Sequence, residues 1–375
     1  MKYFLRNFIS KANFSKGMLL LLLSPLVFYA CGTAPESKGD QIIFTKGVYG
    51  NPGTLLEAGY RFDSLGINAV FVRSGALNPD FYASASAQNA KVYVEFATLN
   101  GQNYLKNHPE AWPINEKGEK APAADWFLGI CPTNVAFKEF RSTELKSILQ
   151  EYQVDGVFLD YVHLHAQFET AAPILPETCF CDHCTGLFGD HIGTDIPGRK
   201  IADRATWILT NTDNEWRAWR NSILNGWVED LGSIVKEYQP EAKLGVFHCA
   251  WFPEDYDQAL YRTLGIDLAG LAERADVLSP MLFHKMSDRP TEWVGEYVGW
   301  LDKFTEAGKI GSPLIWPIVQ AHNHPGVVSP EEFRDVMELG SRSPATGIMM
   351  FSDQSLLEDP RKILVMKELF LMKEE

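Results

Sequence analysis

Short runs of β-branched and aromatic residues recur along the chain from Gln41 onward, and each is followed by a longer stretch with helical spacing. This alternation is typical of βα units that build a parallel sheet. Eight such runs predict an α/β fold, a single (β/α)8 TIM barrel, and residues 41–375 fit the usual size of such a barrel with insertions. The runs are 42–50, 68–75, 91–99, 154–162, 242–250, 275–284, 313–322 and 346–354.

Two of the intervening stretches, 134–152 and 214–238, have clear helical spacing. The second has Trp216, Trp219 and Trp227 on one face. We expect this stripe to pack the helix against the barrel rather than to form a ligand surface. The segment between the fourth run and this helix is long, and it predicts a loop insertion after strand 4.

The N-terminus has the pattern of an export signal. Residues 1–16 are basic, and residues 17–29 form an apolar run that is too short to span a bilayer. The run ends in Ala-Cys-Gly at Cys31, which resembles a bacterial lipobox. We therefore expect a signal peptide over 1–31 that ends at a lipidated Cys31, a polar tether over 32–40, and the barrel over 41–375. A plain secretory signal that is cut nearby is the alternative.

Charge and export together narrow the class of partner. The chain has 34 Lys and Arg against 48 Asp and Glu, a net charge of −14, and it shows no basic stripe that could hold a phosphate backbone. We expect no nucleic-acid partner, and contact with a membrane only through the N-terminal lipid. The sequence does not indicate an oligomeric state. An exported protein of the bacterial cell envelope, in the periplasm or at the outer membrane, meets polysaccharide and peptidoglycan.

Active sites of (β/α)8 barrels lie at the C-terminal ends of the strands. The residues that end the eight runs, or follow them directly, are polar, aromatic and rich in carboxylates, which favours a binding or catalytic site there. These candidates are Tyr49, Asn51, Arg73, Glu95, Asp160, Tyr161, His163, His248, Trp251, His284, Gln320, His322 and Asp353.

Asp160 is the most informative single residue, because a carboxylate that closes an apolar, doubly buried strand is costly unless it is paired or used. The sequence YQVDGVFLDYVHL around it resembles the fourth-strand signature of a group of alpha-amylase-related barrels, the family-10-like or hypothetical glycosyl hydrolases. The similarity covers most of the chain after residue 40. It continues in HPEAW at His108, GICPTN at Gly129, CFCDHC at Cys179, EWRAWR at Glu215, ADVLSPMLFH at Ala275 and PIVQA at Pro317.

The resemblance implies a glycoside hydrolase that acts on a polysaccharide or on peptidoglycan glycan strands. Glycosidic bonds are normally cleaved between two carboxyl groups, of which one protonates the leaving oxygen and the other attacks or activates water. In related barrels a fourth-strand Asp commonly acts as nucleophile or base, which implies that role for Asp160. Glu95 is the first candidate for the second carboxyl group, followed by Asp353 and then Glu254, with Asp255 in the same loop. A seventh-strand Glu is excluded, because that strand ends in Gln320.

Aromatic residues near the strand ends suit a sugar ligand, because the C–H faces of a pyranose lie well on aromatic rings. The hydroxyl groups of a sugar need planar donors and acceptors, for which Arg73, Asn51, His248 and Gln320 are candidates, and His284 is a further candidate for substrate binding. Candidate ring faces are Tyr49, Trp126, Tyr161, Trp251, Trp316 and Phe351.

The cysteines indicate a second possible site. Cys179, Cys181 and Cys184, with His183 between them, form CFCDHC inside the insertion. This spacing lets thiolates converge on one ion, as in zinc knuckles, with a fourth ligand from His183, His191 or His165, so a structural zinc without a catalytic role is one interpretation. A disulfide within the loop is the other interpretation, because export favours oxidation. Cys131 and Cys249 are expected to be small buried residues.

Two other functions remain open. A metal-dependent barrel hydrolase could use His248, His284 and Asp353, but the first run reads TKGVYGN and lacks the His-x-His pair that such enzymes need. We expect no cofactor for catalysis. A glycan-binding lipoprotein without activity could retain the same cleft, because a fold does not guarantee its usual reaction.

Overall fold

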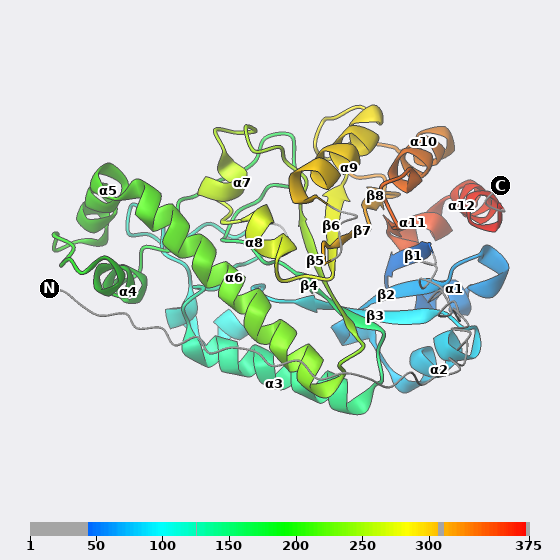
Figure 1. Ribbon diagram of the computed structural model, residues 1–375, viewed down its shortest axis with the longest axis horizontal. Coiled ribbons are helices and arrows are strands. Elements are labelled where there is room, and N and C mark those ends of the chain that lie inside the picture. The colour runs from blue at the N-terminus through cyan, green and yellow to red at the C-terminus, as the bar shows by residue number, and fades with distance from the viewer. Residues whose placement is uncertain (1–43, 125, 307–310, 373–375) are drawn as a thin grey trace, which may run out of the picture. The chain divides into compact units, whose positions relative to one another are not determined.

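The structure is a computed structural model that describes residues 44–124, 126–306 and 311–372 (Figure 1). The expected signal peptide and tether, residues 1–40, lie outside the described residues and stay a prediction. Among the described helices, none has the length and apolar character needed to cross a bilayer.

Nine parallel strands form one closed sheet among the described residues. The hydrogen-bonded order is β5-β4-β3-β2-β1-β9-β8-β6-β7, and a further pairing of β5 with β6 closes the barrel. Two short strands, β7 and β8, share one position because Pro317 between them has no N–H to donate. The eight predicted strand positions and the (β/α)8 barrel are therefore confirmed. The strands are β1 (Thr45–Gly50), β2 (Ala69–Arg73), β3 (Lys91–Ala97), β4 (Gly156–Asp160), β5 (Lys243–Cys249), β6 (Val277–Leu282), β7 (Leu314–Ile315), β8 (Ile318–Gln320) and β9 (Gly347–Phe351).

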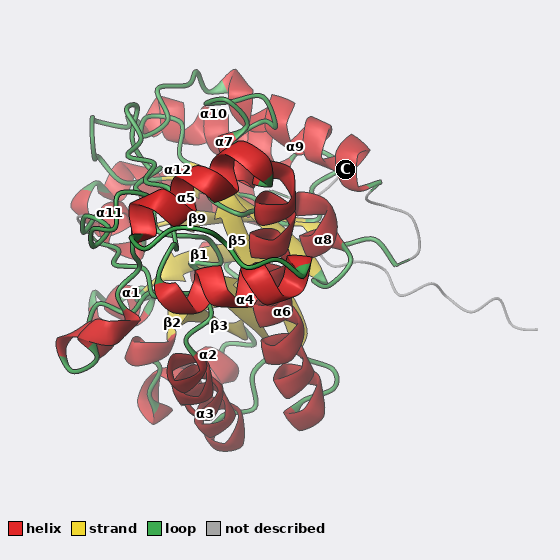
Figure 2. Ribbon diagram, turned by 90° about the vertical axis from the view of Figure 1, so that its left-hand side faces the viewer, coloured by secondary structure: helices red, strands yellow, loops and turns green. Residues whose placement is uncertain are grey.

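Helices enclose the strands on the outside (Figure 2). The predicted helices 134–152 and 214–238 are confirmed as α3 (Val135–Glu151) and α6 (Asp213–Tyr238). The other helices are α1 (Gly53–Glu57), α2 (Pro79–Ala87), α4 (Asp182–Ile192), α5 (Ile201–Asn211), α7 (Ala259–Arg262), α8 (Leu268–Ala272), α9 (Glu292–Thr305), α10 (Pro330–Ser341), α11 (Asp353–Glu358) and α12 (Pro360–Leu371).

Aromatic side chains fill the inside of the barrel. Phe71 stacks on Tyr93 with 4.9 Å between ring centroids, and Phe158 stacks on Trp316 at 5.8 Å. Gly245 makes room for this packing, because a Cβ atom there would lie 2.4 Å from the Phe158 ring. These rings form a dry layer below the ends of the strands, and the polar groups above them are consequently poorly solvated.

The insertion after strand 4 is confirmed as the segment that contains α4 and α5, and it packs against the N-terminal part of α6. These helices share a small apolar core with Phe180 and Phe188. Trp216 and Trp219 belong to that core and not to the barrel packing expected for them. Trp227, further along α6, packs in the main core, and its indole N–H donates to the Pro132 carbonyl at 2.8 Å. We call residues 182–219 the insertion lobe.

Candidate functional site

A cleft of about 480 Å³ opens at the C-terminal ends of the strands. Five strand positions contribute to it, those of β1, β2, β4, β6 and β9, together with the loops that follow β3, β4 and β8. The lining includes Tyr49, Arg73, Trp126, Asp160, Tyr161, Glu169, Met281, Phe283, His322 and Phe351.

Asp160 ends β4 and points into this cleft with only 7% of its surface exposed. One of its carboxylate oxygens accepts the backbone N–H of Tyr161 at 2.8 Å, and the other accepts the Tyr49 hydroxyl at 3.3 Å. Tyr161 has a left-handed backbone with φ of 56°, so the chain turns sharply directly after the carboxylate. The geometry fixes the side chain while leaving it open to the cleft.

Burial raises the pKa of Asp160, and the hydrogen bonds from Tyr161 and Tyr49 and the positive charge of Arg73 oppose that rise. Arg73 ends β2, and its guanidinium carbon lies 5.7 Å from the centre of the Phe351 ring. Desolvation therefore favours the neutral form of Asp160, whereas the charge of Arg73 favours its ionised form.

Glu169 is a second carboxyl group of the same cleft. It lies in the loop after β4, is half-buried, and accepts a hydrogen bond from the indole of Trp126. Burial and the negative charge of Asp160 together raise its pKa to about 8. At neutral pH Glu169 therefore carries a proton beside a group that ionises more readily.

Glu95, the first candidate for the second carboxyl group, lies deeper in the barrel. Register places Ala97 of β3 opposite Asp160, so Glu95 is two residues further down its strand, opposite Phe158. It is 4% exposed and does not line the cleft. Burial raises its pKa, as does the charge of Asp160, so Glu95 is a neutral neighbour beneath Asp160.

Asp353 is held by the backbone at the barrel rim. One oxygen accepts the Asn51 N–H at 2.9 Å, and the other accepts the Thr54 hydroxyl. Gly50 allows this approach, since a Cβ atom there would lie 2.2 Å from the Asp353 carboxylate. Asp353 is 2% exposed, and neither it nor Asn51 lines the cleft. The structure thus joins Asp353 and Asn51 to each other rather than to Asp160.

Three further candidates have other neighbours. Gln320 accepts the Lys285 N–H at 3.0 Å and donates to two carbonyl groups of the next loop, so it connects two loops. His248 faces outward toward Tyr297 of α9, with 6.4 Å between ring centroids, and burial lowers its pKa to about 4. His284 is 2% exposed, does not line the cleft, and has a pKa lowered to about 4 by burial.

Of the three tryptophans expected to offer ring faces, Trp126 lines the cleft, whereas Trp251 and Trp316 pack against other aromatic residues. Trp316 lies inside the barrel, and Trp251 packs on Phe168 and Tyr256 with ring centroids 6.1 and 4.3 Å apart. Neither lines the cleft. In the loop after β5, Glu254 is exposed away from the cleft and Asp255 accepts from Arg289 at 2.9 Å.

Tyr49, Arg73, Asp160 and Tyr161 are thus the candidates that the structure brings together, with Trp126, His322 and Phe351 around them. Sequence analysis missed Glu169. Its only local signal is an acid beside a phenylalanine in an irregular loop, eight positions after Tyr161. Loop acids were considered after the fifth strand but not after the fourth, where the loop 161–181 brings Glu169 to the cleft.

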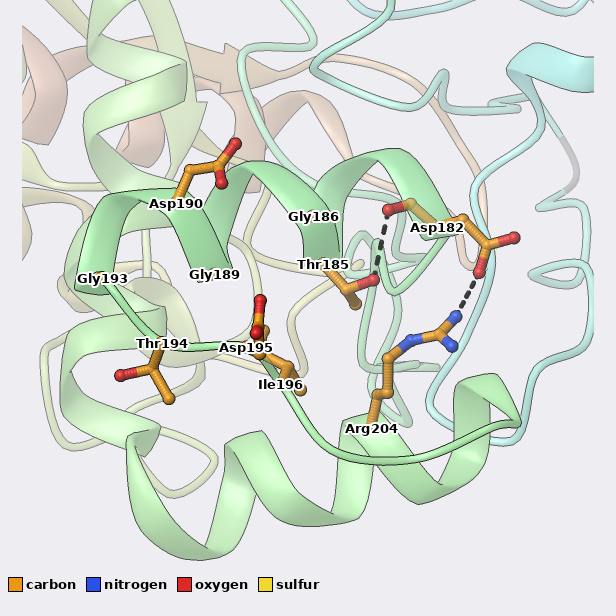
Figure 3. A pocket seen from close by; sticks show the side chains of 10 residues that line it. All are labelled: Asp182, Thr185, Gly186, Gly189, Asp190, Gly193, Thr194, Asp195, Ile196 and Arg204. Carbon is orange, nitrogen blue, oxygen red and sulfur yellow. Dashed lines mark hydrogen bonds and ion pairs between the residues drawn. The ribbon is translucent and has the colours of Figure 1, made fainter.

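A larger hollow of about 600 Å³ lies in the insertion lobe between α4 and α5 (Figure 3). Its walls are glycine backbone and exposed carboxylates, and Arg204 reaches across to pair with Asp182. Asp190 and Asp195 lie apart from that pair in the view. No buried acid or base converges there among the residues that line it, so we place the candidate site in the cleft.

A group of four thiols lies where the insertion begins. The Sγ atoms of Cys131, Cys179, Cys181 and Cys184 are all within 4.8 Å of one another. All four are free cysteines, as is Cys249, which is buried elsewhere. His183, expected in this set, is exposed on α4 and is not part of the group. Cys131, expected to be only a small buried residue, takes that fourth place.

No protein-family model and no curated protein matches this sequence. Solved structures do match it. The PgaB (BpsB) glycoside hydrolase domain from Bordetella bronchiseptica aligns over 88% of this chain and 100% of that chain, with a TM-score of 0.62 and 13% identity. The likeness to this glycoside hydrolase domain is one of fold.

Two β-galactosidases share the architecture. That of Bacillus circulans sp. alkalophilus aligns over 88% of this chain with a TM-score of 0.65 and 13% identity. A catalytic mutant of the GH42 β-galactosidase Gan42B from G. stearothermophilus aligns over 88% of this chain with a TM-score of 0.58 and 12% identity. The matched part covers 55% and 57% of those two chains. At these identities the likeness concerns the fold.

Proposed function

We propose that this chain hydrolyses glycosidic bonds, with Glu169 as the general acid and Asp160 as the second carboxyl group. The observation that carries the proposal is that these two carboxyl groups line one cleft, where burial raises the pKa of Glu169 to about 8 and that of Asp160 only to about 6. Two carboxyl groups with separated pKa values are the arrangement by which glycosidases divide acid and base work.

Each group has surroundings that suit its role. Glu169 is half-buried under Trp126, so at neutral pH it keeps a proton that it can give to the leaving oxygen. Asp160 accepts two hydrogen bonds, which favour its charged form, and it acts as the nucleophile or as the base that activates water. Arg73 stabilises that negative charge.

The rest of the cleft suits a sugar. Trp126, Tyr161 and Phe351 present partly exposed rings, which pack well against the C–H faces of a pyranose. Arg73 and His322 are placed to bind hydroxyl groups. With the export pattern of residues 17–31, these features favour a polysaccharide or a peptidoglycan glycan strand outside the cytoplasm as the substrate.

The test is release of reducing ends by the purified protein on a panel of plant, host and bacterial glycans, including peptidoglycan strands. The Asp160→Asn variant should lose this release. Asp155→Asn is the matched control, because Asp155 precedes the same strand at the opposite end of the barrel, where its carboxylate accepts the Val92 N–H at 2.8 Å.

Release that disappears only in Asp160→Asn would establish the glycosidase and identify its substrate class. Binding of a glycan by both wild type and Asp160→Asn, with no release from any member of the panel, would contradict the proposal and favour a glycan-binding protein.

A further inference from the structure

We propose that the four cysteines Cys131, Cys179, Cys181 and Cys184 bind one zinc ion, which holds together the two loops that carry Trp126 and Glu169. The metal site stands on the thiol geometry alone. Its consequence for Glu169 rests on the function proposed above.

The spacing of the sulfur atoms fits a single tetrahedral ion. With Zn–S bonds of about 2.3 Å, the edge of a tetrahedron of sulfur atoms is about 3.8 Å. The Sγ atom of Cys131 lies 3.7 Å from that of Cys181 and 3.4 Å from that of Cys184. A disulfide would join only two sulfur atoms, at about 2.05 Å. Four mutually close thiols, none of them paired, favour one common centre.

Backbone N–H groups point at two of the four sulfur atoms, and one hydroxyl group lies beside the other two. The backbone N–H of Ile114 donates to Cys179 and that of Cys184 donates to Cys181, both at 3.4 Å. The hydroxyl of Thr133 lies 3.2 Å from the sulfur of Cys184 and 3.4 Å from that of Cys131. Such hydrogen bonds fix and stabilise thiolate ligands. When zinc binds, the thiols release their protons, and four thiolates with Zn²⁺ leave a local charge of −2.

Arg220 provides a positive charge near this group. Its guanidinium is 2% exposed and donates to the Thr178 carbonyl, directly before Cys179. Its Nε atom has no hydrogen-bond partner among the described residues. The same guanidinium pairs with Glu177 at 3.4 Å, so Glu177 balances part of its charge, and the remainder opposes the excess negative charge of a four-thiolate site.

The ligands come from two separate loops. Cys131 lies near the end of the loop between β3 and α3, Cys179 and Cys181 end the loop between β4 and α4, and Cys184 lies in the first turn of α4. Near the thiols, the Phe180 N–H donates to the Ile114 carbonyl at 2.8 Å. A metal ion there joins the loops at the end where both return to helices.

The same two loops meet again beside the cleft. His165 accepts the Gly129 N–H at 3.0 Å and contacts the Pro122 carbonyl. The ring of Phe127 stacks on Tyr161, with centroids 5.2 Å apart and planes 3° apart. Trp126 then donates to Glu169. The positions of Glu169 and Trp126 therefore depend on how the two loops are held together. The zinc site fixes these loops to each other at one end.

The first experiment measures metal and thiols in the purified protein. We expect one zinc per chain by elemental analysis, and release of that zinc as four thiols are titrated with a mercurial reagent. Disulfides in place of free thiols, or iron in place of zinc, would overturn the assignment.

Variants test the ligand set. Cys131→Ser and Cys184→Ser should each lose most of the zinc. His183→Ala and Cys249→Ser should retain it, because His183 is exposed and Cys249 is buried outside the group. Loss of zinc in His183→Ala with retention in Cys131→Ser would replace our ligand set with the one expected from the sequence. Wild-type metal content decides the matter even if a cysteine variant fails to fold.

Hydrogen exchange tests the role of the metal without any glycan. Zinc removal from the wild type should increase amide exchange in residues 111–131 and 161–181, while α9 and α10 stay protected. Equal exchange with and without zinc in those two segments would refute the positioning role. Because neither readout involves turnover, an inactive protein that binds zinc would count against the glycosidase proposal alone.

Discussion

Two aspartates close strands of the same barrel, and their surroundings give them different roles. Asp160 at the end of β4 receives one backbone N–H and one tyrosine hydroxyl and opens to the cleft. Asp353, the first residue of α11 and two positions after β9, receives the backbone N–H of Asn51 and the hydroxyl of Thr54 in α1 and is closed off. Both accept two hydrogen bonds, so the number of bonds does not separate them.

What separates them is the second carboxyl group and the open space. Asp160 has Glu169 across the cleft and Glu95 beneath it, and both interact with it electrostatically. Asp353 connects β9 to the first helix through Thr54. A carboxylate at a strand end is therefore a catalytic candidate only when it faces a cavity and another group that can exchange protons with substrate.

The largest expected effect is a difference in activity between the variants of the two aspartates. Asp160→Asn should lower glycan hydrolysis by at least about 10³-fold, because the residue acts on the reacting atoms. Its melting temperature should stay equal or rise at neutral pH, because an ionised buried carboxylate is removed. Asp353→Asn should retain most activity. Turnover and thermal unfolding measured on both variants check this, and equal loss of activity in both would erase the distinction.

The next effect concerns Glu169. Glu169→Gln should lower activity by about 10² to 10⁴-fold on natural glycans, because it removes the proton donor. Aryl glycosides whose leaving group needs no proton should lose far less. Asp160→Asn should not show this rescue. Kinetics on both substrate types decide the assignment, and equal losses on both would remove Glu169 from the role of acid.

The pH profile separates the two carboxyl groups in the wild type. Glu169 must be protonated to act as the acid, so activity should fall as the pH rises through about 8. Asp160 must be ionised, so activity should fall again as the pH drops below its own raised pKa. A bell-shaped profile of kcat/KM is expected, and an alkaline limb that persists in Glu169→Gln would belong to another group.

A smaller effect is expected at Tyr49. Tyr49→Phe removes the hydroxyl that donates to Asp160 but keeps the ring that packs between Phe247 and Phe351. Loss of that bond raises the pKa of Asp160, so the acidic limb should move to higher pH, with a loss of about 10-fold in activity at neutral pH. An unshifted limb would show that the hydroxyl does not stabilise the charged form.

Substitution of Asp353 should have the smallest effect on activity, but it should lower the stability of the fold. Asp353→Asn replaces an acceptor oxygen with a donor in a closed site, which should lower the free energy of unfolding by about 1 to 3 kcal/mol. Denaturant unfolding measures the change. Thr54→Val is a useful companion, since it removes only the hydroxyl half of the same contact.

The barrel could be predicted from the sequence because buried parallel strands are continuous apolar runs, and all eight positions were found. Asp160 was found for the related reason that an acid at the end of such a run needs an explanation. Strand ends do not reveal the direction of each side chain. His248 follows Phe247, which packs inside the barrel, and therefore faces α9 instead of the cleft.

Glu169 could not be predicted by strand position, because a loop places it. Its location depends on Trp126, Phe127 and His165, which come together only through contacts between two loops. Cys131 was missed for the same reason, since 48 residues separate it from Cys179. Contacts between loops that are distant in sequence leave no periodic pattern for sequence analysis to detect.

Helix α6 has a consequence for how this architecture can change over time. It has 26 residues, about 39 Å at 1.5 Å per residue, and one end supports the insertion lobe while the other packs on the barrel. Lengthening or shortening one helix end can therefore enlarge, exchange or remove the lobe while every strand keeps its register. Descendants of such a barrel, or designed hybrids, can gain or lose a lobe beside the same strands by altering a single stretch of chain.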